Sequence, residues 1–489
     1  MVDCNRGTSN TKQAAWVALG SLFSFGFGII SSMILSRYFS KGDYGTYKQV
    51  LFIYNTLLVV FTLGLPKAYS YFLPRVNINQ GKDVVNKITR LFLILGTIFS
   101  ALLYILSNQI AQVLSNDDLA YALKVFSIVP ILMLPTMGLE SILATYKKAR
   151  FMTAYVIVTR TAQLLFIVLP VILWNLNYVY ALLGFDIACF VSFALALKLK
   201  NIPFLEVTKF EKSDIGYIEI LKFSVPLMMA SIWAIIAQSA DQFFISHYFG
   251  KEVFAEFSNG WMELPFIGMI TGACATVLSP VFSKLSSERV DPKVEIFPLW
   301  MRVFEKSALL IYPFLLYSCF FADYIMVFLY GNQYIDSDIF FIFKNLSCFF
   351  QIIIFAPLMI NVGGMKYYSK IQFYTAIALL FFEYISVKTL PSPYLIGIIS
   401  TICSIVRVFL MLIFVAKYFN IKIYQLFPIN SILKIVSISI VILAGLRYLL
   451  SIYLDSYLLI LIISFMLYCL LYIPLCHFCK INYISLLKN

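Results

Sequence analysis

Long apolar stretches alternate with short polar connections from one end of the chain to the other. About 14 of these stretches approach the ~20 residues that a helix needs to cross a bilayer. They lie at roughly 14–35, 49–66, 91–108, 119–144, 151–174, 177–197, 223–243, 260–282, 305–329, 339–362, 371–389, 394–415, 432–453 and 456–476. Several contain Pro or Gly, which spanning helices tolerate. The pattern predicts an all-α polytopic membrane protein with about 14 transmembrane helices.

Composition supports this prediction. The 489 residues are 61% hydrophobic and only 12% charged, and the mean hydropathy is +0.88. A soluble domain needs more charge to cover its surface. The aromatic share of 17% fits many membrane interfaces, where Tyr and Trp settle. These values exclude a globular domain with a single anchor.

The connections between the predicted spans differ in basic residues. If the N-terminus is cytoplasmic, the inner connections carry the Lys and Arg clusters, as at residues 147–150, whereas outer ones such as 115–118 carry few. Residues 37–48, with three basic side chains, are an exception. The positive-inside rule thus predicts that both termini face the cytoplasm. The net charge of +13 then reflects topology and membrane lipids, and no basic arm or stacking platform predicts a nucleic-acid partner.

Two separate stretches of the chain are alike. Residues 34–47 read ILSRYFSKGDYGTY, and residues 243–257 read FFISHYFGKEVFAEF. Both are expected to form a short amphipathic loop, after the first and the seventh span. The similarity predicts two six-helix bundles, 1–200 and 201–420, related by a pseudo-twofold repeat, followed by two additional helices at 421–489. Many secondary transporters are built from such repeats and rock about a site near the bilayer midplane.

Residues 37–47, RYFSKGDYGTY, resemble the signature that follows the first helix of polysaccharide exporters. Asp241 and the ISHYFG run at 245–250 resemble the same family in the second copy. Ser40, Ala255 and Phe257 depart from its usual pattern. The family comprises the O-antigen and capsule flippases, within the multidrug/oligosaccharidyl-lipid/polysaccharide exporter superfamily.

The resemblance implies a transporter rather than an enzyme. Its expected substrate is a lipid-linked oligosaccharide, usually on undecaprenyl diphosphate, which moves from the inner to the outer leaflet for an O-antigen, a capsule or another surface polymer. It also implies a monomer that works alongside polysaccharide polymerase machinery. The two bundles would alternate in access, driven by H⁺, Na⁺ or the membrane potential.

Charged residues inside the spans are the candidate site residues, because a charge at the bilayer centre costs roughly 2.5–3.5 kcal/mol on insertion scales. A diphosphate head needs cations to cross. The candidates for substrate binding are Lys124, Arg160, Lys344, Arg407, Arg37 and Asn55. For each cation the alternative is a helix-end side chain that reaches the interface or a structural ion pair. For Lys124, close to the start of its span, the side chain that reaches the interface is favoured. For Lys344, an ion pair with the nearby Asp338 is the alternative. For Asn55 it is lipid-facing packing.

Three acids are candidates for ion coupling, because a carboxylate in an apolar setting can exchange a proton or hold Na⁺. Asp241 lies in an unusually polar patch of its span, and by family resemblance its span and that of Glu263 border the cavity. Glu140 follows Pro135 and Gly138, where a broken helix is expected. As alternatives, Asp241 caps its helix or pairs with Arg37, Glu263 lies near the interface, and Glu140 pairs with Arg160.

Other functions fit less well. A multidrug exporter of the same superfamily usually has twelve spans, two fewer than predicted here. A glycan polymerase has a long outer loop, whereas the outer connections here are short. An acyltransferase needs a buried catalytic His, and neither of the two histidines, His247 and His477, is well placed for that role. No phosphate-binding loop of the GxxxxGK[ST] type occurs. The CHFC run at 476–479 lacks the second ligand pair of a zinc site. We therefore expect no cofactor and no metal.

Overall fold

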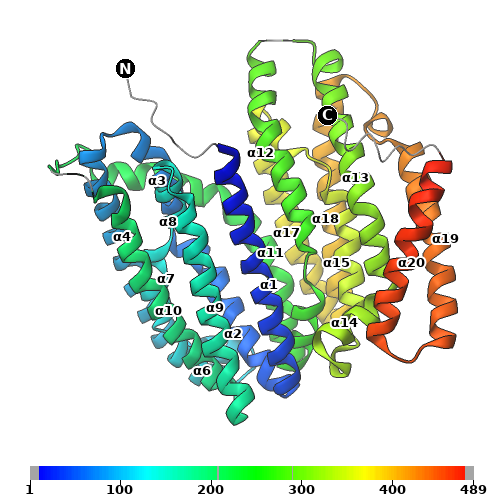
Figure 1. Ribbon diagram of the computed structural model, residues 1–489, viewed down its shortest axis with the longest axis horizontal. Coiled ribbons are helices and arrows are strands. Elements are labelled where there is room, and N and C mark those ends of the chain that lie inside the picture. Colours follow the sequence, from blue (N-terminus) through cyan, green and yellow to red (C-terminus); the bar gives the residue numbers. More distant parts are fainter. Residues whose placement is uncertain (1–9, 206, 208, 289, 480–489) are drawn as a thin grey trace. The chain divides into compact units, whose positions relative to one another are not determined.

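Every element in the described part of the chain is helical (Figure 1). The computed structural model describes residues 10–205, 207, 209–288 and 290–479. Within these residues ten helices are long and apolar enough to cross a membrane, or up to twelve if each of two bent pairs forms one span. The prediction of an all-α, multi-pass membrane protein is confirmed. The predicted number of 14 is not, and the expected span at 339–362 is interrupted between α15 and α16. The predicted location of the two chain ends falls outside the described residues.

The chain divides into two compact units. The first comprises the described residues up to Ile235 together with Ser246–Ala255, and the second comprises Ile236–Ile245 and the residues from Glu256 onward. The long helix α11, Tyr217–Gly260, therefore contributes to both. The division at residues 200 and 420 stays a prediction.

The first unit is built from α1 to α10 and parts of α11. The bounds are α1 Asn10–Tyr38, α2 Lys41–Phe61, α3 Leu65–Phe72, η1 Leu73–Arg75, α4 Ile78–Ile105, α5 Ser107–Val113, α6 Asp118–Phe126, α7 Val129–Met133, η2 Leu134–Thr136, α8 Leu139–Thr145, α9 Ala149–Trp174, α10 Tyr178–Asn201 and η3 Ile202–Phe204. Helix α9 packs between α1 and α10 (Figure 1). The fourth predicted span is broken, as expected, at Pro135 and at Gly138, whose φ of 75° favours glycine.

The expected amphipathic loops after the first and seventh spans are wrong. In the first copy only a short turn separates α1 from α2, because Ser40 caps α2 by accepting a hydrogen bond from the Asp43 backbone at 3.1 Å. In the second copy α11 continues to Gly260 and breaks at Gly250, whose φ is 81°. Gly250 is the repeat equivalent of Ser40. Both copies thus form helix–turn–helix segments, each with a residue suited to a helix break.

The two repeated segments pack on each other inside the first unit. A Cβ atom at Gly45 would lie 2.0 Å from the carbonyl oxygen of Lys251, so only glycine allows this approach. Gln49 donates a hydrogen bond to Ser246 at 2.7 Å and accepts one from Asn116 at 2.6 Å. All three polar side chains are buried. The contact explains why residues 246–255 belong to the first unit.

The second unit contains the rest of α11 and the helices that follow it. These are α12 Pro265–Ser287, η4 Pro292–Ile296, α13 Phe297–Phe320, α14 Ala322–Tyr330, η5 Asn332–Tyr334, α15 Ser337–Gln351, α16 Ala356–Asn361, α17 Met365–Thr389, α18 Pro393–Phe419, η6 Ile423–Leu426, α19 Ile429–Tyr453 and α20 Tyr457–Phe478. Trp300 is buried and donates to the Ile354 carbonyl at 2.8 Å. The last two helices, α19 and α20, pack side by side (Figure 1). Arg447 of α19 holds Asp323 of α14 through two hydrogen bonds.

Candidate substrate and ion site

A polar cavity of about 420 Å³ lies inside the second unit. It is lined by α11, α15, α17 and α18 and by the segment that joins α11 to α12. Its lining residues are Ala237, Gln238, Asp241, Gln242, Trp261, Glu263, Lys344, Ser347, Gln351, Thr375, Leu379, Ser400, Cys403, Ser404 and Arg407. Four residues predicted from the sequence, Asp241, Glu263, Lys344 and Arg407, therefore border one cavity. They come from the two predicted classes, two cations and two acids.

Two buried carboxyl groups face each other beside this cavity. Asp241 of α11 is 3% exposed and Glu383 of α17 is 0% exposed. They interact electrostatically, and two like charges buried together favour a proton on one of them. The Ser400 hydroxyl of α18 donates to Asp241 Oδ2 at 2.8 Å.

The remaining oxygens of this acid pair lack donors. Among the described residues, nothing donates a hydrogen bond to Asp241 Oδ1 or to either carboxyl oxygen of Glu383. Buried acceptors without a partner are costly, at about 1–3 kcal/mol each and more when charged. Such oxygens suit a proton shared between two of them, or a small cation that several of them coordinate.

Two cations act on the same site. Arg407 of α18 and Lys344 of α15 are half-buried and interact electrostatically with Asp241. Lys344 also lies over the Trp261 ring, 5.7 Å from its centroid, a cation–π arrangement that holds the amine at the cavity wall. The guanidinium of Arg407 offers several donors in a planar fork, which matches phosphate oxygens.

Neutral polar groups complete the wall. Gln238 and Gln242 lie on the same helix as Asp241, in the polar patch seen in the sequence. Gln351 donates to Ser347 at 3.2 Å, and both residues line the cavity. The cavity thus combines groups that bind phosphate, groups that bind sugar hydroxyls and an acid pair.

The other sequence candidates lie in the first unit, and none of them lines this cavity. Arg37 is in the last turn of α1, Asn55 in the middle of α2, Lys124 in the last turn of α6, Glu140 in the first turn of α8 and Arg160 in α9. Lys124 is half-buried, and the other four are exposed. Arg160 donates to Gln163, one turn along its own helix, at 2.7 Å. Their roles stay predictions.

Sequence reasoning missed Glu383 and Ser400 as site residues. Glu383 is one of the charges within the apolar spans, but no spacing in the sequence links it to Asp241. The only available signal was the cost of a carboxylate in that setting. Ser400 has no distinguishing signal, because serine is common in spanning helices.

An all-helical bundle with a polar, charged cavity is the architecture of a membrane transport protein. Solved structures show the same fold. The lipid II flippase MurJ, in an inward closed conformation, matches with a TM-score of 0.74 and 16% identity over 95% of this chain and 98% of that one. An inward-facing multidrug resistance MATE transporter of the MOP superfamily matches with a TM-score of 0.63 and 14% identity, over 81% and 95%. A MOP superfamily transporter from Pyrococcus furiosus matches with a TM-score of 0.58 and 14% identity, over 83% of this chain and 95% of that one.

The family follows from the sequence itself. Residues 34–338 match the model of the family described as polysaccharide biosynthesis protein. The match covers more than half of the chain, so the protein belongs to this family. The resemblance of residues 37–47 to polysaccharide exporters is confirmed by it. A search of the curated proteins found no match.

Proposed function

We propose that this protein is a flippase that carries a lipid-diphosphate-linked oligosaccharide from the cytoplasmic to the outer leaflet for cell-surface polysaccharide synthesis. The family supports the biosynthetic context. The fold that the chain shares with a lipid II flippase supports a lipid-linked substrate. The observation that carries the proposal is the cavity in the second unit, which places Arg407 and Lys344 beside a buried acid pair.

Each group has a role in this proposal. Arg407 and Lys344 neutralise the diphosphate, which otherwise meets a high cost in the bilayer. Trp261 fixes the Lys344 amine, and the glutamines of the cavity bind sugar hydroxyls. Cationic cargo of the multidrug type is the alternative: Asp241 and Glu263 would attract it, but Arg407 and Lys344 would repel it, whereas an anionic head uses both basic groups.

The acid pair supplies ion coupling in this proposal. Asp241 and Glu383 hold one proton, or Na⁺ in its place; three of their four carboxyl oxygens have no donor among the described residues. Loss of that ion leaves two like charges together beside Arg407 and Lys344, which changes the affinity of the cavity for an anionic head. Ion and substrate binding are thereby linked, as alternating access requires.

The finer biological assignment is also part of the proposal. We place the protein in the inner membrane of a bacterium, as its resemblance to the O-antigen and capsule flippases implies, and we place both termini in the cytoplasm from the distribution of basic connections. The polymer is an O-antigen, a capsule or another envelope glycan. The protein acts as a monomeric transporter upstream of a polymerase.

Deletion of the gene in the native host tests the proposal. Lipid-linked oligosaccharide is expected to accumulate on the cytoplasmic leaflet, and wild-type protein from a plasmid is expected to clear it. Asp241→Asn and Glu383→Gln at equal expression should fail to clear it, since each removes a carboxylate from the pair. Glu219→Gln is the matched control, because Glu219 is exposed on the same helix as Asp241 and outside the cavity.

The outcomes separate transport from coupling. Export of full-length polymer by the deletion strain, with no accumulated intermediate, would falsify the flippase assignment. Normal clearance by both acid variants would retain the flippase and reject the acid pair as its coupling site. Proteoliposomes with an imposed H⁺ or Na⁺ gradient then identify the ion.

A further inference from the structure

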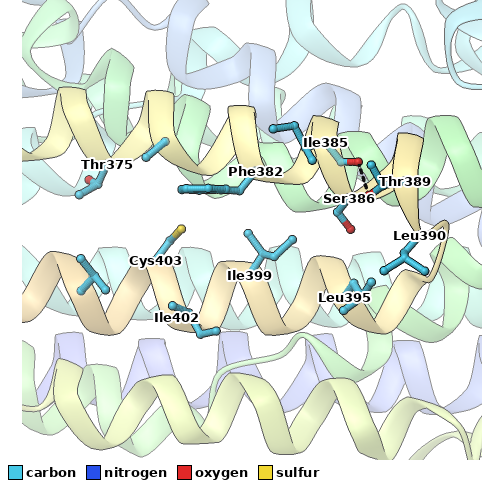
Figure 2. A pocket seen from close by; sticks show the side chains of 12 residues that line it. Thr375, Phe382, Ile385, Ser386, Thr389, Leu390, Leu395, Ile399, Ile402 and Cys403 are labelled. Atoms are coloured by element: carbon cyan, nitrogen blue, oxygen red, sulfur yellow. Dashed lines mark hydrogen bonds between the residues drawn. The ribbon is translucent and has the colours of Figure 1, made fainter.

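A second, apolar crevice runs between α17 and α18 in the second unit. It measures about 470 Å³, within the range of pockets that hold drug-sized ligands. Figure 2 shows Phe382 and Ser386 of α17 and Ile399 and Cys403 of α18 pointing into the space between the two helices.

The lining of the crevice offers little to a polar ligand. The Thr375 hydroxyl donates to the Ile371 carbonyl at 2.7 Å, and the Thr389 hydroxyl donates to the Ile385 carbonyl at 2.9 Å, the bond that Figure 2 marks. Both hydroxyl donors are therefore satisfied within their own helix. Among the lining residues, Ser386 alone has a buried hydroxyl without a partner in the described part of the chain.

The crevice adjoins the polar cavity. Thr375 and Cys403 line both, so the two spaces share one wall formed by a residue from each helix. A larger apolar pocket of about 1030 Å³ lies between α13, α15, α18 and α19, but it shares no lining residue with the polar cavity. Of these two apolar spaces, only the α17–α18 crevice shares lining residues with the cavity that Lys344 and Arg407 border.

We propose that the α17–α18 crevice binds the proximal part of the substrate's polyisoprenoid chain while the diphosphate lies in the polar cavity. The inference rests on the proposed function. An anionic head next to an apolar chain matches a cationic cavity that adjoins an apolar crevice. The crevice is too small for a whole undecaprenyl chain, so it holds the isoprene units nearest the diphosphate, and the rest of the chain lies in the bilayer.

The position along the helices adds a direction. The crevice extends from Thr375, in the middle of α17, to Leu390 beyond its last residue. In the proposed topology this end of α17 faces outward. The crevice therefore guides the chain in the outer half of the membrane, where it must lie after transfer.

Photocrosslinking in proteoliposomes tests this site. The probe is undecaprenyl diphosphate with a diazirine on an isoprene unit near the diphosphate, and phosphatidylglycerol with the same group on its acyl chain is the comparison. We expect the isoprenoid probe to label residues 375–390 and 395–406, and unlabelled undecaprenyl diphosphate, but not phosphatidylglycerol, to reduce this labelling at least fivefold.

Two variants fill the crevice from opposite sides. Ala378→Trp on α17 should lower, at least fivefold, the competed labelling, which is the part that unlabelled undecaprenyl diphosphate removes. Ile399→Phe on α18 fills the crevice in a second way should the first variant fold poorly. Ile377→Trp is the control, because Ile377 is 44% exposed on the same helix and does not line the crevice. Its labelling should stay within twofold of wild type.

Each contrary result has a distinct meaning. Equal, uncompeted labelling by both probes identifies ordinary surrounding lipid and overturns the inference. Competed labelling at residues 423–436 instead places the chain in the larger pocket and also overturns it, with the flippase function intact. No competed labelling anywhere in the wild type counts against the proposed substrate itself.

Discussion

Replacement of Gln49 by leucine removes the side chain that joins the two copies of the repeat inside the first unit. Gln49 donates to Ser246 at 2.7 Å and accepts from Asn116 at 2.6 Å. Asn116 keeps a second acceptor, the Thr46 hydroxyl at 2.9 Å. Leucine preserves most of the volume but offers neither donor nor acceptor.

The expected cost follows from burial. Gln49 and Ser246 are 0% exposed and Asn116 is 4% exposed, so water does not replace the lost partners. Two lost hydrogen bonds that leave buried polar groups unpaired cost about 1–3 kcal/mol each at most, and Asn116 is partly compensated. We expect Gln49→Leu to destabilise the protein by about 2–4 kcal/mol.

A double-mutant cycle with Ser246→Ala tests the contact itself. Unfolding is followed by denaturant titration in mixed micelles for wild type, both single variants and the double variant. We expect the double variant to be less destabilised than the sum of the single effects, with an interaction energy of about 1–2 kcal/mol. Gln109→Leu, at an exposed site on α5, should change stability by no more than about 0.5 kcal/mol.

Strict additivity would refute the reasoning. If the single effects add to within about 0.3 kcal/mol, Gln49 and Ser246 do not interact in the folded protein. The attachment of residues 246–255 to the first unit would then need another explanation.

Two further changes test close contacts within each unit. Gly45→Ala should lower the melting temperature, because its Cβ would lie 2.0 Å from the Lys251 carbonyl oxygen and overpacking of this kind costs about 1–3 kcal/mol. Gly26→Ala is the control and should leave the melting temperature unchanged, because nothing lies within 4 Å of its Cβ position. Equal melting temperatures of the two variants would contradict the packing. Arg447→Gln breaks the hydrogen bonds of 3.0 and 2.9 Å from Arg447 to Asp323. Because the Arg447 and Asp323 side chains are 41% and 24% exposed, we expect the free energy of unfolding to fall by only about 1–2 kcal/mol. Protease cleavage between α18 and α19 should rise in that variant, and an unchanged cleavage rate would show that the pair does not anchor α19.

Local pattern determined much of the fold in advance. Helices span where about 20 apolar residues occur in a row, because a chain in hydrocarbon must satisfy its own backbone hydrogen bonds. The break near Pro135 and Gly138 was readable for the same local reason. The family resemblance of residues 37–47 also came from the sequence, since it depends only on the order of these residues.

The turns after the first and seventh spans show where local pattern fails. Their mixed polar and apolar residues predicted loops, but the polar residues face partners from elsewhere in the chain. Thr46, for example, accepts a hydrogen bond from Asn116, which is distant in sequence. A polar side chain that is buried with its partner has the same sequence signature as one in water, so the pattern alone does not separate the two cases.

The candidate site divides in the same way. The sequence picked out Asp241, Lys344 and Arg407 because charge in a spanning helix is costly wherever the helix packs. It did not show that these residues share a cavity, or that Glu383 is the partner of Asp241. Those facts depend on how α11, α15, α17 and α18 pack together. Side-chain contacts between distant helices are set by that packing, and only the tertiary structure decides it.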